Sequence, residues 1–252
     1  DLNSNSITGT GNLDIANGTI KLDGNYPTGT DNVALGNTAL DSVEAGGINN
    51  VAIGDNAGTA ITTGDSNTAV GKDSLIANTT ASNNVAVGTY ALDANTTGAE
   101  NTAVGRSALS SNITGANNVA VGRSALLTNT ASDNTAMGYQ ALAANTSGTA
   151  NVAIGCGTLD SNTTGTNNVA AGKHSLGANT TGASNTAIGR TAMNSNTEGD
   201  LNTAVGCGAL YTNSTADNNT AIGASALTAN TTGEKNTAVG KGSMTRNTTG
   251  KC

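Results

Sequence analysis

The most informative segment of the chain reads Asn101-Thr102-Ala103-Val104-Gly105, followed by Ala108-Leu109 and by a second asparagine, Asn112. Nearly the same line occurs thirteen times between residues 32 and 252. The copies begin 17 residues apart, except for one step of 18 and one of 16, at Asn32, Asn50, Asn67, Asn84, Asn101, Asn118, Asn134, Asn151, Asn168, Asn185, Asn202, Asn219 and Asn236. A short repeat of constant length is typical of solenoids, in which each repeat contacts mainly its neighbours. The pattern therefore predicts a rod rather than a globule with a pocket.

Each repeat is numbered here from its first asparagine, and positions 2 to 4 are expected to form a short strand. Side chains alternate between the two faces of a strand, so positions 2 and 4 share one face and position 3 lies on the other. Position 4 is apolar in every copy and position 3 is always alanine. Apolar residues on both faces favour a parallel sheet that is covered on each side. The sequence therefore predicts an all-β parallel β-roll, or β-solenoid, of about 13 coils.

The sequence leaves two explanations for the alanine at position 3. We expect position 4 and the Leu or Met at position 9 to form a thin core. An alanine without exception, as at Ala86, Ala103 and Ala120, indicates that something approaches closely, and a second copy of the chain is the simplest candidate. The alternative is that alanine merely fits the narrow interior of a single roll.

Two further positions are expected to form the corners of the coil. Glycine stands at position 5 in every copy, including Gly88, Gly105 and Gly122, and is expected to adopt a positive φ where the chain turns. The asparagine at position 12 of the last eleven repeats precedes Thr-Thr-Gly or a close variant and indicates the opposite turn. Stacked asparagines form ladders in layered β architectures. We therefore interpret Asn95, Asn112 and Asn129 as structural rather than ligand-binding.

Composition limits the partners and the domain organisation. The chain has no Phe, no Trp and a net charge of −7, which argues against a nucleic-acid-binding surface. It has no apolar run of 18 residues, so this segment is not expected to insert into a membrane, and it starts at Asp1, as a processed product or part of a longer protein would. Residues 1–31 do not fit the repeat and are expected to be a β-rich lead-in or stalk, with Pro27 at the boundary to the repeat domain, residues 32–252.

Three cysteines cannot form a paired framework of disulfides. Cys156 and Cys207 occupy the same repeat position three coils apart, or roughly 14 Å if each coil rises about 4.8 Å. That separation excludes a bridge between the two within one chain. The role of Cys252 stays open.

Several repeats resemble those of a known class of surface proteins. Asn-Val-Ala-Ile-Gly at 151–155 and Asn-Thr-Ala-Ile-Gly at 185–189 resemble the Ser-Val-Ala-Ile-Gly repeats of head domains in trimeric autotransporter adhesins. They are equally similar to the longer repeat arrays of bacteriophage tail fibres, and the resemblance covers residues 32–252. It implies a left-handed roll, a homotrimer, an extracellular place on a virion or bacterial surface, and a role in host attachment. The adhesin repeat is shorter, and no coiled-coil stalk, membrane anchor or fibre-chaperone segment is visible here; the hairpin-like lead-in favours a phage fibre.

Candidate binding residues gather at position 6, directly after the corner glycine. Stacked in register, its basic residues would form a positive stripe along the rod, consisting of Lys72, Arg106, Arg123, Lys173, Arg190 and Lys241. One interpretation is a contact line for acidic glycans on a host surface, and the other is solubility and pairing with acids of another chain.

Catalytic chemistry has little support in the sequence. The single histidine, His174, stands at position 7, where other repeats carry Ser, Thr or Tyr, and no pair of carboxylates recurs at one register. The repeat also lacks the Asp and Gly pattern of calcium-binding solenoids. We therefore expect no catalytic residues, no metal and no cofactor. The leading hypothesis is a non-enzymatic fibre or adhesin segment that contacts a host glycan or protein, and the alternative is a structural spacer without receptor specificity.

Overall fold

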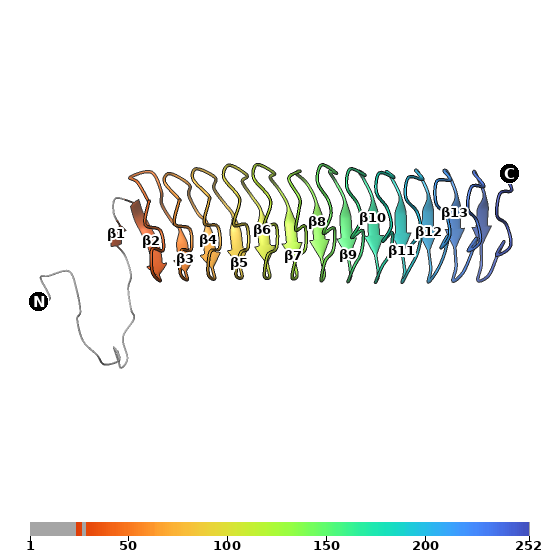
Figure 1. Ribbon diagram of the computed structural model, residues 1–252, viewed down its shortest axis with the longest axis horizontal. Helices are drawn as coiled ribbons and strands as arrows, with labels where there is room; N and C mark the ends of the chain where they lie inside the picture. The colour runs from red at the N-terminus through yellow and green to blue at the C-terminus, as the bar shows by residue number, and fades with distance from the viewer. Residues whose placement is uncertain (1–23, 27–28, 252) are drawn as a thin grey trace, which may run out of the picture.

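The computed structural model describes residues 24–26 and 29–251, which form one all-β solenoid without a helix (Figure 1). One sheet of 14 strands runs along the rod in chain order. The strands are β1 (Gly24–Tyr26), β2 (Gly29–Leu35), β3 (Val51–Ile53), β4 (Thr68–Val70), β5 (Val85–Val87), β6 (Thr102–Val104), β7 (Val119–Val121), β8 (Thr135–Met137), β9 (Val152–Ile154), β10 (Val169–Ala171), β11 (Thr186–Ile188), β12 (Thr203–Val205), β13 (Thr220–Ile222) and β14 (Thr237–Val239). Strands β2 to β14 are parallel, so the predicted all-β parallel solenoid with a 17-residue repeat is confirmed.

Neighbouring strands pair with identical repeat positions opposite one another. In β6 and β7, for example, Ala103 lies opposite Ala120 and Val104 opposite Val121. The register is constant because the repeat length is nearly constant. Each coil brings the same repeat position opposite its equivalent in the neighbouring strand. The steps of 18 and 16 residues preserve this register too, so the extra and missing residues are absorbed outside the strand.

The first strand of the sheet differs from the rest. Strand β1 pairs with β2 antiparallel, with Gly24 opposite Asn32 and Tyr26 opposite Gly29. The edge of β2 that faces away from β3 is thereby covered by another strand, which blocks it from pairing with other chains. Residues 1–23 of the predicted lead-in lie outside the described residues.

The core contains alanine at positions 3 and 8 and leucine at position 9. Ala103, Ala108 and Leu109 have no exposed surface in the single chain. The prediction that position 4 belongs to this core is wrong, since Ile154 keeps 46% of its surface exposed. The expectation that Ala86, Ala103 and Ala120 face a second copy is wrong as well, because they lie inside the roll. The structure agrees with the alternative: these alanines line the interior of a single roll, in one core with the position 9 leucines.

Glycine at position 5 forms the corner that the sequence predicted. Gly105 has a φ of 133°, and Gly88 and Gly122 have values within a degree of it. A Cβ on Gly105 would lie 2.7 Å from the backbone of Gly122 in the next coil. Only glycine meets both requirements, a positive φ and close contact between stacked corners.

Two residues of the second coil differ from the repeat pattern, and one replacement compensates for the other. Gly58 replaces leucine at position 9, and Ile61 replaces asparagine at position 12. Ile61 is fully buried, and its Cδ1 lies 3.0 Å from the point that a Cβ on Gly58 would occupy. The larger residue therefore fills the space that the missing leucine leaves.

None of the described residues belongs to a helix with the length and hydropathy needed to cross a membrane.

Candidate functional site

Two ladders of largely buried asparagines run along the rod, one at position 1 through all repeats and one at position 12 from Asn78 onward. At position 1, each backbone N–H donates to the side-chain oxygen of the preceding asparagine, as from Asn118 to Asn101 Oδ1 at 3.0 Å. At position 12, the side-chain amides of the continuous parts donate to the preceding asparagine's oxygen and to the carbonyl three residues on, as from Asn112 to Asn95 at 3.0 Å and to Gly115 at 2.9 Å. The predicted stacking of the position 12 asparagines is present as a hydrogen-bonded ladder. The position 1 ladder was missed, although asparagine begins every repeat.

The position 12 ladder has one interruption. The repeat that begins at Asn118 has only 16 residues and lacks one residue of the turn after Asn129. Asn129 donates to the carbonyl of Ala131 at 2.7 Å instead of reaching back to Asn112. Asn112 Oδ1 is consequently buried without a hydrogen-bond partner among the described residues. The position 1 ladder continues through the same repeat, since the Asn134 N–H donates to Asn118 Oδ1 at 3.0 Å.

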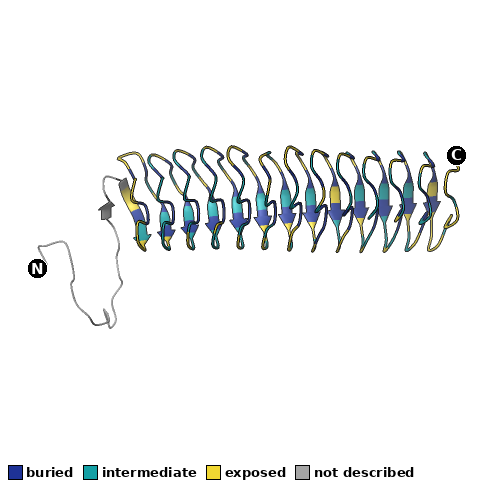
Figure 2. Ribbon diagram, in the orientation of Figure 1, coloured by how far each residue is buried: buried dark blue, intermediate teal, exposed yellow. Residues whose placement is uncertain are grey.

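The outer surface of the sheet carries a row of exposed and half-exposed apolar side chains. Along each three-residue strand from β3 onward, one buried alanine lies between two more exposed residues (Figure 2). The position 4 residues form a row that is here named the aliphatic face. Its members are Leu35, Ile53, Val70, Val87, Val104, Val121, Met137, Ile154, Ala171, Ile188, Val205, Ile222 and Val239. Strand spacing places consecutive members about 4.8 Å apart.

The aliphatic face is exposed even though the core is complete without it. Leu35, Ile188 and Ile222 keep between 42% and 47% of their surface exposed. Single exposed apolar residues are normal on proteins, but a contiguous row of them marks an interaction surface.

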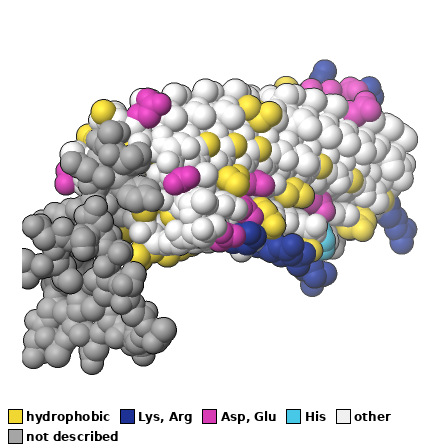
Figure 3. All heavy atoms as spheres, turned by 60° about the vertical axis from the view of Figure 1, so that its left-hand side comes forward, with side chains coloured by type: hydrophobic (Ala, Val, Ile, Leu, Met, Phe, Trp, Pro, Cys, Tyr) yellow, Lys and Arg dark blue, Asp and Glu magenta, His cyan; other side chains and the backbone are white. Residues whose placement is uncertain are grey.

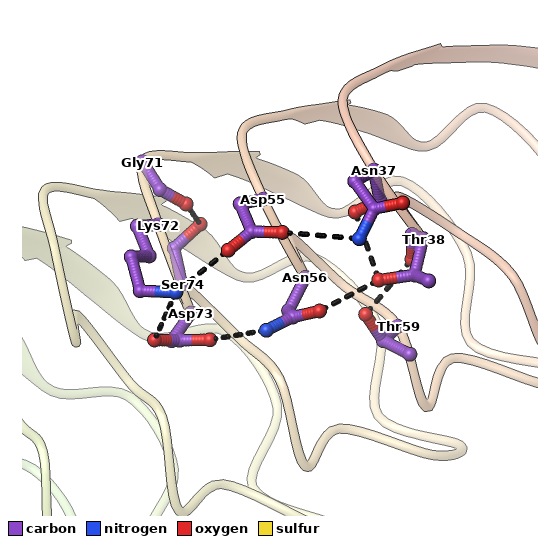
Figure 4. Close-up of polar contacts among 9 residues, drawn as sticks. All are labelled: Asn37, Thr38, Asp55, Asn56, Thr59, Gly71, Lys72, Asp73 and Ser74. Carbon is purple, nitrogen blue, oxygen red and sulfur yellow. Dashed lines mark hydrogen bonds and ion pairs between the residues drawn. The ribbon is translucent and has the colours of Figure 1, made fainter.

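Lys72 belongs to a polar cluster in the first three coils (Figure 4). Its Nζ lies 2.6 Å from Asp55 Oδ2 and 3.5 Å from Asp73 Oδ2. The hydrogen bond from Lys72 holds the pKa of the Asp55 carboxyl below its usual range, and the same bond raises the pKa of Lys72. Asn56 continues the cluster by donating to Asp73 at 2.8 Å. The charge of Lys72 is therefore matched by acids of its own chain.

The other five basic residues of position 6 have no such match. Arg106, Arg123, Lys173, Arg190 and Lys241 are exposed, and none forms an ion pair with another described residue. Figure 3 shows Lys and Arg side chains along one edge of the rod, with the single histidine near the same edge. The six predicted residues thus divide into one neutralised lysine and five free cations.

Aromatic and thiol side chains lie between these cations in the same row. The guanidinium of Arg123 lies over the ring of Tyr139, 5.8 Å from its centroid, which is within the range of a cation–π contact. Arg190 Nη2 lies 3.6 Å from the sulfur of Cys207. Cys156 and Cys207 are both exposed and unbridged, which confirms the predicted absence of a disulfide between them. Cys252 lies outside the described residues.

Two carboxyls at position 10 are perturbed by their surroundings. Partial burial raises the pKa of Asp93 and of Asp160, more than nearby backbone N–H groups lower it. They lie four repeats apart and cannot act on one substrate atom. Across residues 24–26 and 29–251, no group of three His, Cys, Asp or Glu side chains is arranged to hold a metal ion.

The candidate site is therefore a pair of surfaces, the aliphatic face and the basic row beside it, rather than a cavity with converging reactive groups. Comparison of the chain with protein-family profiles, with curated proteins and with solved structures finds no match.

Proposed function

We propose that this chain is a non-enzymatic segment of an extracellular fibre, from a virion tail or a bacterial surface, that assembles as a homotrimer and presents a surface for host attachment. The observation that carries the proposal is the aliphatic face. Burying a Val, Leu or Ile side chain from water contributes about 1.5–3 kcal/mol. A row of thirteen positions, eleven of them Val, Leu or Ile, on a straight rod favours lengthwise contact with an equally straight partner, and a second copy of the same rod supplies one. The number three rests on the resemblance to trimeric adhesins and tail fibres.

Length and repetition suit a fibre. Thirteen coils that each rise about 4.8 Å give a rod of about 60 Å. Side-by-side association of such rods would stiffen them and bury the aliphatic face along its whole length. The alternative function, a structural spacer, is favoured by one observation: the repeated positions 1, 3, 5, 9 and 12 all serve the fold, and none of them forms a site. Both functions require assembly, and they differ in whether the outer surface binds a ligand.

Light scattering coupled to size exclusion tests the assembly. We expect the full chain to elute with three times the mass of one chain. Replacing three members of the aliphatic face by aspartate, as Val121→Asp, Ile154→Asp and Ile188→Asp, should yield monomers with an unchanged circular dichroism spectrum. The control places aspartate at three exposed threonines of position 14, as Thr97→Asp, Thr164→Asp and Thr181→Asp, and should remain trimeric. A wild-type chain that is monomeric at all concentrations would refute the proposal.

A further inference from the structure

We infer that four of the position 6 cations, Arg106, Arg123, Lys173 and Arg190, form a binding site for a linear acidic polysaccharide that lies along the rod. This inference rests on the proposed fibre function and names the ligand class of its surface. The four residues are here called the polyanion row.

The absence of an ion pair separates this row from Lys72 and Lys251. Lys72 is held by Asp55 and Asp73, and Lys251 lies 2.9 Å from Glu234. The four members of the polyanion row have no ion pair with any described residue. The chain as a whole is acidic, with a net charge of −7, so these unpaired cations form a locally positive surface. They attract an anion only at short range, because salt screens charges beyond about 10 Å.

The spacing of the row fits an extended polymer. Arg106 and Arg123 stand in adjacent coils, as do Lys173 and Arg190, and two coils lie between the pairs. Five steps of about 4.8 Å give a row of about 24 Å. A small anion would contact one pair, whereas only a chain with repeated charges could contact both.

Side chains next to the row are suited to sugar hydroxyls. In the coils from Arg106 to Arg190, position 7 presents Ser107, Ser124, Gln140, His174 and Thr191, which can donate and accept hydrogen bonds, and Gly157. Neither position 6 nor position 7 carries an acid between residues 101 and 191, whereas Asp55 and Asp73 hold those positions nearer the N-terminus. Arginine binds carboxylate or sulfate groups through paired N–H donors, so both kinds of acidic sugar fit.

Nucleic acid fits this surface less well. Binding of single strands relies on several aromatic side chains that stack on successive bases. The stretch from Arg106 to Arg190 contains one aromatic residue in the row, Tyr139, and Arg123 already lies over its ring. The observations therefore favour a polysaccharide.

Binding of polygalacturonate and of dextran sulfate to the full, assembled chain tests the inference, with neutral dextran as a negative control. We expect both polyanions to bind, more weakly as salt is added, and neutral dextran not to bind. The variant Arg106→Gln, Arg123→Gln and Arg190→Gln should bind at least tenfold more weakly. The matched control, Lys235→Gln, Arg246→Gln and Lys251→Gln, removes the same charge elsewhere and should bind like the wild type.

The possible outcomes separate this inference from the proposed function. Equal weakening in the two variants would show attraction by overall charge and would overturn the polyanion row, as would absence of binding by a chain that is trimeric. A change of mass in the row variant would show that the row pairs copies of the chain instead. Single-stranded poly(dT) that binds as tightly as the polysaccharides, with the same loss in the row variant, would overturn the choice of ligand.

Discussion

Both faces of the parallel strands carry apolar side chains, but the residues on the two faces are constrained very differently. In β6, Ala103 points into the roll with no exposed surface, while Thr102 and Val104 point outward. The inward position is alanine in all thirteen copies, whereas the outward position 4 carries Leu, Ile, Val, Met and Ala. The inner position packs in the closed interior together with the position 9 leucines, so the volume of its side chain is restricted. At position 4 of the outer face, apolar residues of several sizes and shapes occur.

The strongest test of this contrast enlarges one residue on each face of the same strand. Ala103→Leu should destabilise the chain by about 3 kcal/mol, because extra methylene groups in a filled interior force the backbone apart. Val104→Leu should change stability by less than about 1.5 kcal/mol, since Leu35 already occupies that register. Urea denaturation of both variants measures the difference. Equal losses would mean that the outer position is packed as tightly as the inner one.

Buried polar residues extend the comparison of the inside with the outside of the roll. The interior restricts hydrogen bonding as well as side-chain volume. Asn162 and Asn112 are both fully buried at position 12, and each side-chain amide donates two hydrogen bonds. Asn162 Oδ1 also accepts from Asn179 at 2.8 Å, whereas Asn112 Oδ1 accepts none among the described residues. Asn162→Ala should therefore destabilise the chain by about 1 kcal/mol more than Asn112→Ala.

Measuring the free energies of unfolding of Asn162→Ala and Asn112→Ala tests this difference. A larger loss in Asn112→Ala would show that the interrupted ladder is supported by contacts other than side-chain hydrogen bonds.

The smallest expected effect on stability comes from Asp93, whose carboxyl is neither fully buried nor fully exposed. Asp93 has a buried oxygen without a partner, and burial raises its pKa. A raised folded pKa means that the folded chain binds the proton more tightly, so stability falls as pH rises from the unfolded pKa through the folded one. Asp93→Asn should thus stabilise the chain by up to about 1 kcal/mol at pH 7 and have little effect at pH 3.

Asp41→Asn is the control for this pH dependence, because Asp41 holds the same repeat position and is exposed. Thermal unfolding at pH 7 and pH 3 compares the two variants. The burial argument fails if both stabilise the chain equally at pH 7.

Much of the architecture was predictable because the repeat encodes it many times over. The strand at positions 2 to 4, the glycine corner and the position 12 ladder follow from residue type and spacing alone. The direction of the strand faces did not follow, since alternation assigns Ala103 and Val104 to opposite faces without saying which is inside. Both are apolar, so hydropathy could not decide between them.

The remaining corners of the coil were also hidden from the sequence. Leu109 and Ser107 have φ values of 53° and 55°, in the left-handed region that few non-glycine residues adopt. Hydrogen bonds between coils hold this conformation, as from the Leu109 N–H to the Ala125 carbonyl at 3.0 Å. These hydrogen bonds form only when the next coil is in place, so no local sequence pattern predicts these turns.

The sequence by itself determined the repeat length, the parallel register, the glycine corners and the place of the position 9 leucines in the core, because each is a local requirement repeated along the chain. Only the tertiary structure decided that alanine lines the interior, that the position 4 residues lie outside, and that Lys72 is neutralised while Arg106, Arg123, Lys173 and Arg190 are free. These properties depend on which groups meet across coils. Contacts across coils follow from the width of the roll and the path of its turns, and a one-dimensional pattern of polarity specifies neither.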